Sequence, residues 1–267
     1  MGKKVLDYMN RSDSSARDDI DKGIKTFTYY ADQTMIGYNS ALVSRSMVEK
    51  LVELSNAAYE AQKLSAGLGM ATEADTLSAQ KDLISAQKSL LKINSTIDNL
   101  SSSLCLMTGY SADATPVIGG LPQLTDEMIS TLNLEEDTQK AVSNNYDVIS
   151  ERHSSSGKTT TGMKNKDDNV SEAEQNVIIT IQAYYQGIIQ SKTAYEAANT
   201  AFQKATLEKE KADRSYNLKM LSKIQYLQAQ MAYLKAQGEK ESAYNTFYQT
   251  YNTYQWAVDG IILDSAK

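Results

Sequence analysis

The chain has 267 residues, enough for one or two domains, and 33 acidic against 27 basic residues give it a formal net charge of −6. This mildly acidic balance, without a basic stripe, argues against nucleic-acid binding. The single cysteine, Cys105, excludes an intrachain disulfide and a thiolate-rich zinc site, and we expect neither a metal nor a cofactor.

The composition predicts an all-α protein built from long helices. Only two prolines occur, Pro116 and Pro122, while Ala, Leu, Lys, Gln, Glu and Met are abundant. Apolar runs such as 177–181 are too short to cross a bilayer, so we expect no direct membrane insertion by the chain as given. No nucleophile, base and orienting group cluster in the sequence, so an enzyme is not expected.

A first helical hairpin is predicted over residues 1–110. Met47, Leu51, Leu54, Ala58 and Ala61 recur at heptad steps, and a second heptad series runs from Thr76 to Leu104. Between them "TEAD", Thr72 to Asp75, has the spacing of a capping box, in which the first and fourth residues bond each other's backbone amides. A helix is therefore expected to begin at Thr72, after a tight turn at Gly67 and Gly69.

The middle of the chain breaks this pattern. Residues 111–153 contain both prolines and are predicted to form an equatorial connecting segment. Within it a short helix is expected from about Leu134, where the acidic sequence "LEED" favours a helix start. Residues 154–169 are rich in Ser, Thr, Gly and Lys, and we expect a mobile polar linker there. The stretch "NRSDSSARDDIDKG", residues 10–23, occupies the equivalent place in the first half.

A second helical hairpin is predicted over residues 170–267. "SKIQ", Ser222 to Gln225, forms a second capping box, which places another helix start at Ser222. Two heptad series follow on different faces: Tyr226, Ala229, Tyr233, Ala236, Lys240, Ala243, Phe247, Thr250 and Tyr254 on one, and Ile224, Leu227, Met231, Leu234 and Gly238 on the other. Two such faces mean that this helix contacts a neighbour on each side.

The two hairpins are related by an internal repeat. "SAGLGMATEADTLSAQ", residues 65–80, aligns with "SYNLKMLSKIQYLQAQ", residues 215–230, at a constant offset of 150, and six positions are identical. The repeat is strongest at the two turns, and it predicts that both turns have the same structure and lie side by side.

This arrangement resembles the TolC-like outer membrane factors, the outer membrane efflux protein family. The first half carries the pattern Gly-x5-Asp-x3-Ala at Gly69, Asp75 and Ala79, and the second half matches at Tyr216 and Ala229. The resemblance spans about Lys22 to Gly260, but strand pairs that would form the family's membrane β-barrel are not evident, and the two polar linkers stand in their place.

The resemblance implies a homotrimer whose helices form a twelve-helix α-barrel. Such a tunnel belongs to a tripartite efflux or type I secretion system and docks tip-to-tip with a periplasmic adaptor (a membrane fusion protein), which joins it to an inner-membrane pump. The implied location is extracytoplasmic: in the periplasm and associated with the outer membrane, or in the envelope of a host that lacks one.

The resemblance also implies a docking and gating site at the two turns, formed by Gly69, Thr72, Asp75, Tyr216, Lys219, Ser222, Gln225 and Gln228. It gives Asp75 the place of a tip acid and Tyr216 that of its hydrogen-bonding counterpart. The sequence departs from the family at Lys219, where a glycine is expected, at Leu221 in place of an arginine, and at Gln225 and Gln228 in place of acids. Asp75 also has a simpler interpretation, as the acid of a capping box.

Two alternatives remain open from the sequence. The first is a coiled-coil structural or adaptor protein that conducts nothing. The second is a monomeric helical binding module, in which a four-helix bundle within one chain buries both heptad faces.

Overall fold

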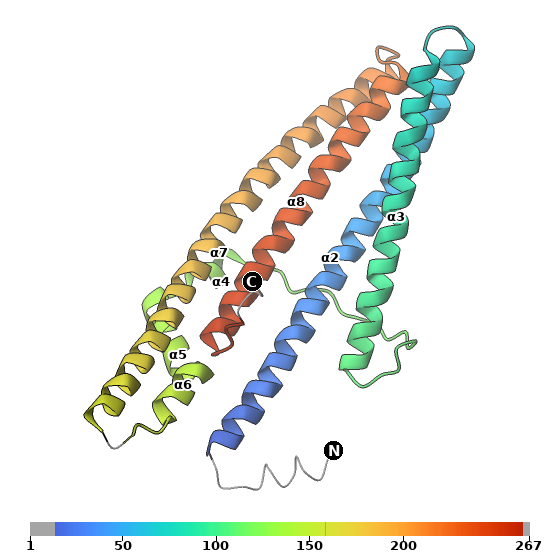
Figure 1. The fold of residues 1–267 in the computed structure, drawn as a ribbon. Coiled ribbons are helices and arrows are strands. Elements are labelled where there is room, and N and C mark those ends of the chain that lie inside the picture. Colours follow the sequence, from blue (N-terminus) through green and yellow to red (C-terminus); the bar gives the residue numbers. More distant parts are fainter. Residues whose placement is uncertain (1–13, 158, 264–267) are drawn as a thin grey trace. The chain divides into compact units, whose positions relative to one another are not determined.

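A computed structural model describes residues 14–157 and 159–263, and these residues form helices and no strands (Figure 1). The helices are α2 (Ser14–Gly67), α3 (Glu73–Met107), α4 (Asp126–Ser130), α5 (Leu134–Asn144), α6 (Tyr146–His153), α7 (Thr160–Asn217) and α8 (Lys223–Val258). Helices α2 and α3 form one long hairpin and α7 and α8 a second, with the short helices between them in sequence. The predicted fold class, an all-α pair of helical hairpins with short connecting helices, is confirmed.

Both polar linkers are shorter than predicted. Helix α7 already begins at Thr160, so most of the stretch 154–169 is helical, and α2 includes everything from Ser14 onward. Residues 10–13 lie outside the described part of the chain. The prediction was wrong because an exposed helix can be polar all round when other contacts hold it. The Thr159 hydroxyl accepts a hydrogen bond from the Gly162 amide at the start of α7, and Arg152 forms an ion pair with Glu174 at 2.8 Å.

Close contacts group the described residues into two units. Unit 1 comprises the chain up to Gln33, the segment Pro122–Gln190 and the chain from Phe247. Unit 2 comprises Thr34–Leu121 and Ser191–Thr246. The long helices pass from one unit into the other. The division by repeat, at 1–110, 111–153, 154–169 and 170–267, stays a prediction, apart from the loop conformation that was expected for 154–169.

In unit 2 the four long helices lie in the order α3, α2, α8, α7 (Figure 1). Gly37 of α2 faces Leu100 of α3, and the α2–α8 contact is a cluster around Leu54, Leu227 and Leu234. On its other side α8 contacts α7 through pairs of aromatic side chains. In one of them the ring centroids of Phe202 and Tyr233 are 5.4 Å apart. Both heptad faces of α8 therefore meet a helix. The sequence predicted a neighbour on each side, and here both neighbours belong to the same chain.

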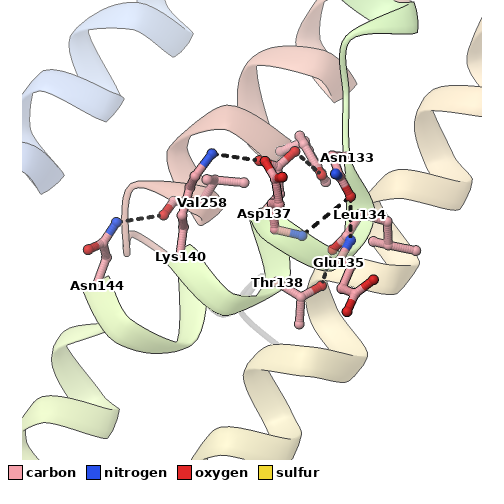
Figure 2. Close-up of polar contacts among 10 residues, drawn as sticks. Asn133, Leu134, Glu135, Asp137, Thr138, Lys140, Asn144 and Val258 are labelled. Atoms are coloured by element: carbon pink, nitrogen blue, oxygen red, sulfur yellow. Dashed lines mark hydrogen bonds and ion pairs between the residues drawn. The ribbon is translucent and has the colours of Figure 1, made fainter.

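In unit 1 the short helices pack against the end of α8. Helix α5 begins at Leu134, where the sequence placed it, and Asn145 ends α5 and begins α6. The Asn145 side chain is buried, accepts hydrogen bonds from the Asp147 and Val148 amides, and donates to the Gly260 carbonyl. Figure 2 shows the neighbouring contact, in which the Asn144 amide group donates to the Val258 carbonyl at 3.1 Å.

In unit 1, aromatic side chains of α8 donate hydrogen bonds to aspartates on α5 and α2. The buried Tyr254 hydroxyl donates to Asp137 at 2.8 Å, and Asp137 also forms an ion pair with Lys140 (Figure 2). Burial raises the pKa of the Tyr254 hydroxyl well above its ordinary value, and the nearby Asp137 carboxylate raises it further. The Trp256 indole donates to Asp32 of α2 at 2.9 Å. These bonds attach α2 and α5 to the last turns of α8.

Candidate docking site at the two helical turns

The two turns of unit 2 have the same backbone structure, as the repeat predicts. Gly69 has φ of 73°, and Lys219, which lies 150 residues later and so holds the equivalent position, has φ of 60°; both lie in the left-handed region. The Met70 amide donates to the Ser65 carbonyl at 2.9 Å, and the Met220 amide to the Ser215 carbonyl at 2.8 Å. The Gly69 amide also donates to the Ala66 carbonyl, and the Lys219 amide to the Tyr216 carbonyl, so each turn is a Schellman ending of the preceding helix.

Both predicted capping boxes are present. The Thr72 hydroxyl accepts from the Asp75 amide at 3.1 Å, and the Thr72 amide donates to the Asp75 carboxylate at 2.9 Å. In the second turn the Ser222 hydroxyl accepts from the Gln225 amide at 3.3 Å, and the Ser222 amide donates to the Gln225 side-chain oxygen at 3.0 Å. The turns therefore fall where the sequence placed them, between Gly67 and Thr72 and between Asn217 and Ser222.

Asp75 and Tyr216 do not form a hydrogen bond with each other in the described chain. The Asp75 carboxylate is engaged by Thr72, whose hydroxyl and amide both donate to it and hold its pKa below the ordinary value. The Tyr216 ring instead stacks on Tyr226, with centroids 4.3 Å apart and planes 5° from parallel. The capping role of Asp75 is thus present, and the implied pairing with Tyr216 is corrected.

Asp75 and Gln228 nevertheless lie close together. Both line a pocket of about 270 Å³ between the first turns of α3 and α8 and the last turns of α2. Gln62 of α2 also lines it, and its side-chain oxygen is buried without a hydrogen-bond partner among the described residues. This pocket brings residues of the two turn regions together, so the turns lie side by side.

A charged cluster supports the second turn from α7. Lys209 and Asp213 form an ion pair at 2.8 Å, and the Lys209 ammonium lies 5.7 Å from the Tyr233 ring centroid. The hydrogen bond with Lys209 is the main cause that lowers the pKa of Asp213. Burial chiefly raises the pKa of Tyr226, with a contribution from Asp213. Lys209 and Asp213 did not stand out in the sequence, because ion pairs at this spacing occur on many exposed helices, and Tyr226 was noted only as a heptad residue.

Each turn exposes two large apolar side chains. Leu68 and Met70 in the first turn are 64% and 73% exposed, and their repeat partners Leu218 and Met220 are 71% and 73% exposed. Sequence reasoning did not select these four as site residues, although Leu and Met are among the positions at which the two turns are identical. Four exposed apolar side chains at adjacent turns are typical of a contact surface for another protein.

Other kinds of site are not found in the described part of the chain. No group of His, Cys, Asp and Glu residues there has the arrangement that a metal ion needs. Among the described helices, none combines the length and the apolar character of a membrane-spanning segment.

Comparison with solved structures decides the fold. A membrane protein from Pseudomonas aeruginosa matches 92% of this chain with a TM-score of 0.71 at 12% identity, over 68% of its own length. CusC, described in terms of transmembrane channel formation, matches 93% of this chain with a TM-score of 0.72 at 10% identity, over 80% of its own length. The chain has a TolC-like fold.

A third neighbour agrees. The CmeC outer membrane channel from Campylobacter jejuni matches 95% of this chain with a TM-score of 0.58 at 15% identity, and the chain covers 66% of it. These neighbours are described as channels or membrane proteins and not as enzymes, in agreement with the expectation from the sequence. No known sequence family and no curated protein matches the chain.

Proposed function

We propose that the chain is the helical tunnel component of a tripartite efflux or type I secretion system in the cell envelope. In this proposal three copies each contribute the four long helices of unit 2 to one α-barrel. The fold supports the proposal, because its solved neighbours include outer membrane channels. The proposed location is extracytoplasmic, where such a tunnel would meet its partners.

The two turns are the proposed docking surface for an adaptor protein, through which the tunnel would join an inner-membrane pump. The observation that carries this is the pair of identical turns, each capped in the same way and each exposing one leucine and one methionine. Methionine and leucine adapt to a partner surface, and burying each such side chain contributes about 1.5–3 kcal/mol. The capping boxes and Schellman bonds hold these side chains on a rigid support.

Site-specific photocross-linking in the source cell tests the docking. A photoreactive residue is placed at Leu68 or Leu218, with Ser89 on the exposed side of α3 as the matched control. We expect both turn positions, and not Ser89, to cross-link to an adaptor with a helical hairpin, identified by mass spectrometry. Cross-linking to that adaptor from Ser89 as strongly as from the turns, or from none of the three positions, contradicts docking at the turns.

The tunnel itself is tested by electron microscopy of the associated protein. End views of a conducting α-barrel show a ring with a central lumen. A filled four-helix bundle in every view would favour the monomeric binding module, and a solid rod would favour the non-conducting spacer.

A further inference from the structure

One pocket of unit 2 contains a hydrogen-bond acceptor that has no donor. It is the pocket of about 270 Å³ near the two turns, and Gln62 of α2 lines it together with Gln228 of α8. The side-chain oxygen of Gln62 is buried, and no described residue donates a hydrogen bond to it. A buried acceptor without a donor costs free energy, so a ligand that donates to this oxygen would be stabilised in the pocket.

The same pocket is negatively charged. Asp75 and Asp82 of α3 line it, and no basic side chain is among the described residues that line it. Both donors of Thr72 bond one oxygen of Asp75, Oδ2, and no described residue donates to its second oxygen. Asp82 forms neither an ion pair nor a hydrogen bond within the described chain. Carboxylates bind charged donors more strongly than neutral ones, so the ligand should carry positive charge.

The remaining wall of the pocket is apolar. Ile224, Leu227 and Met231 of α8 form most of it, and Ala58 of α2 and Ala79 of α3 complete it. Methylene groups of a ligand would bury apolar surface against these side chains. A metal ion would gain nothing from such a wall, and no group of His, Cys, Asp and Glu among the described residues is arranged to hold one. An organic cation therefore fits the pocket better than a metal ion.

The polar residues of the pocket lie at two levels. Helices α2 and α3 run antiparallel, so residues equally far from the turn lie side by side. Gln62 is seven residues before Gly69 and Asp75 is six residues after it, so these two form one level. Ser55, which lines the pocket and is only 3% exposed, forms the second level with Asp82. The two levels are seven residues apart, which is about 10 Å along the helix axis.

We infer that this pocket binds a linear aliphatic polyamine. One terminal ammonium group donates to Asp75 and to the Gln62 oxygen, and the other donates to Asp82 and Ser55 about 10 Å away. The methylene chain between the two ammonium groups lies on the apolar wall. A single chain forms the whole pocket, so the inference goes beyond the proposed tunnel and does not depend on association of copies.

NMR of the full chain with isotope-labelled methionine methyl groups tests the site. Met231 lines the pocket, and Met128 of α4, which does not, is the internal reference. The probe is spermidine, a linear triamine. We expect the Met231 signal to shift and saturate as spermidine is added, while the Met128 signal stays nearly constant. The absence of a saturable shift of Met231 would overturn the inference.

Two simpler cations are the control ligands. Propylammonium has one charged group, so its dissociation constant should be at least about tenfold higher than that of spermidine. Mg²⁺ is charged but has no methylene chain, and it should leave the Met231 signal nearly unchanged. A shift of Met231 with Mg²⁺ that equals the shift with spermidine would mean that the carboxylates only attract counterions, and the inference would be wrong.

Substitution of a carboxylate tests the charge of the pocket. Asp82→Asn should raise the dissociation constant for spermidine by about tenfold or more, because one of the two carboxylates is lost. Glu73→Gln is the matched control, since it removes the same charge from the first turn of α3 at a residue that does not line the pocket. It should change the dissociation constant by no more than about twofold. Equal losses in both variants would show that net charge and not the pocket attracts the polyamine, against the inference.

Gln62→Met distinguishes binding from folding. Methionine has a similar length, but its sulfur accepts hydrogen bonds only weakly. The Gln62 oxygen has no donor in the described chain, so the Tm should not fall, whereas the dissociation constant for spermidine should rise by about fivefold or more. A fall in Tm with an unchanged dissociation constant would give Gln62 a structural role only and contradict the inference.

Discussion

Gly69 and Lys219 hold the same left-handed backbone conformation at the two turns, but only glycine adopts it without a steric cost. Lys219→Gly should therefore stabilise the second turn by about 1 kcal/mol. Gly69→Lys should destabilise the first by a similar amount, because no atom lies within 4 Å of the added Cβ and the cost is conformational alone. Chemical denaturation measures both. Equal signs for the two substitutions would contradict the equivalence of the turns.

Acid should open one capping box and not the other. The pKa of Asp75 is lowered in the folded protein by the two Thr72 donors, so its contribution to stability is present above the unfolded pKa of about 4. That contribution is lost as the pH falls through the lower, folded pKa. Gln225 occupies the same position in the second box and does not titrate.

NMR reports this difference residue by residue. In an acid titration the Thr72 amide resonance should shift together with the Asp75 carboxylate, while the Ser222 amide resonance stays nearly constant. Parallel shifts of both amides would show that the Asp75 carboxylate is not the cause.

At the scale of elements, Gly260 holds the end of α8 against the end of α5. It has φ of 97°, and a Cβ there would lie 2.2 Å from the Asn144 carbonyl oxygen. Gly260→Ala should therefore destabilise unit 1 by more than about 2 kcal/mol, since both the backbone and the neighbouring helix must shift. Gly120→Ala, where a Cβ meets nothing within 4 Å, is the control. Thermal unfolding of both variants compares them, and equal losses would contradict a role for this contact.

The turns could be predicted from the sequence and the linkers could not, for a physical reason. A capping box is local: the hydroxyl of Thr72 and the carboxylate of Asp75 satisfy each other's amides whatever the rest of the chain does. The start of α2 depends instead on contacts far away in sequence, such as Lys22 with Asp147 at 2.6 Å and Lys25 with the Asp259 carbonyl. A polar composition alone cannot distinguish such a helix from a loop.

The candidate site shows the same limit. The repeat predicted both turns and both heptad faces of α8. It did not predict that Tyr216 stacks on Tyr226, because aromatic packing depends on how two helices face each other. The repeat showed that the two turns share a leucine and a methionine, at Leu68 and Leu218 and at Met70 and Met220. It did not show that these side chains are exposed, because exposure depends on how the turn folds.

The proposed tunnel requires several copies of the chain to associate. A single copy leaves Leu77, Ile84 and Leu91 of α3 exposed. Burying each of these side chains against another copy contributes about 1.5–3 kcal/mol, before the cost of association is subtracted. Because association depends on concentration, copies should join as the protein is concentrated.

Light scattering of the full chain from micromolar to near-millimolar concentration measures this association. If three copies form the tunnel, the molar mass rises from that of one 29.5 kDa chain to a plateau at three times this value. A mass that stays at one chain over the whole range would contradict the tunnel and favour the monomeric binding module.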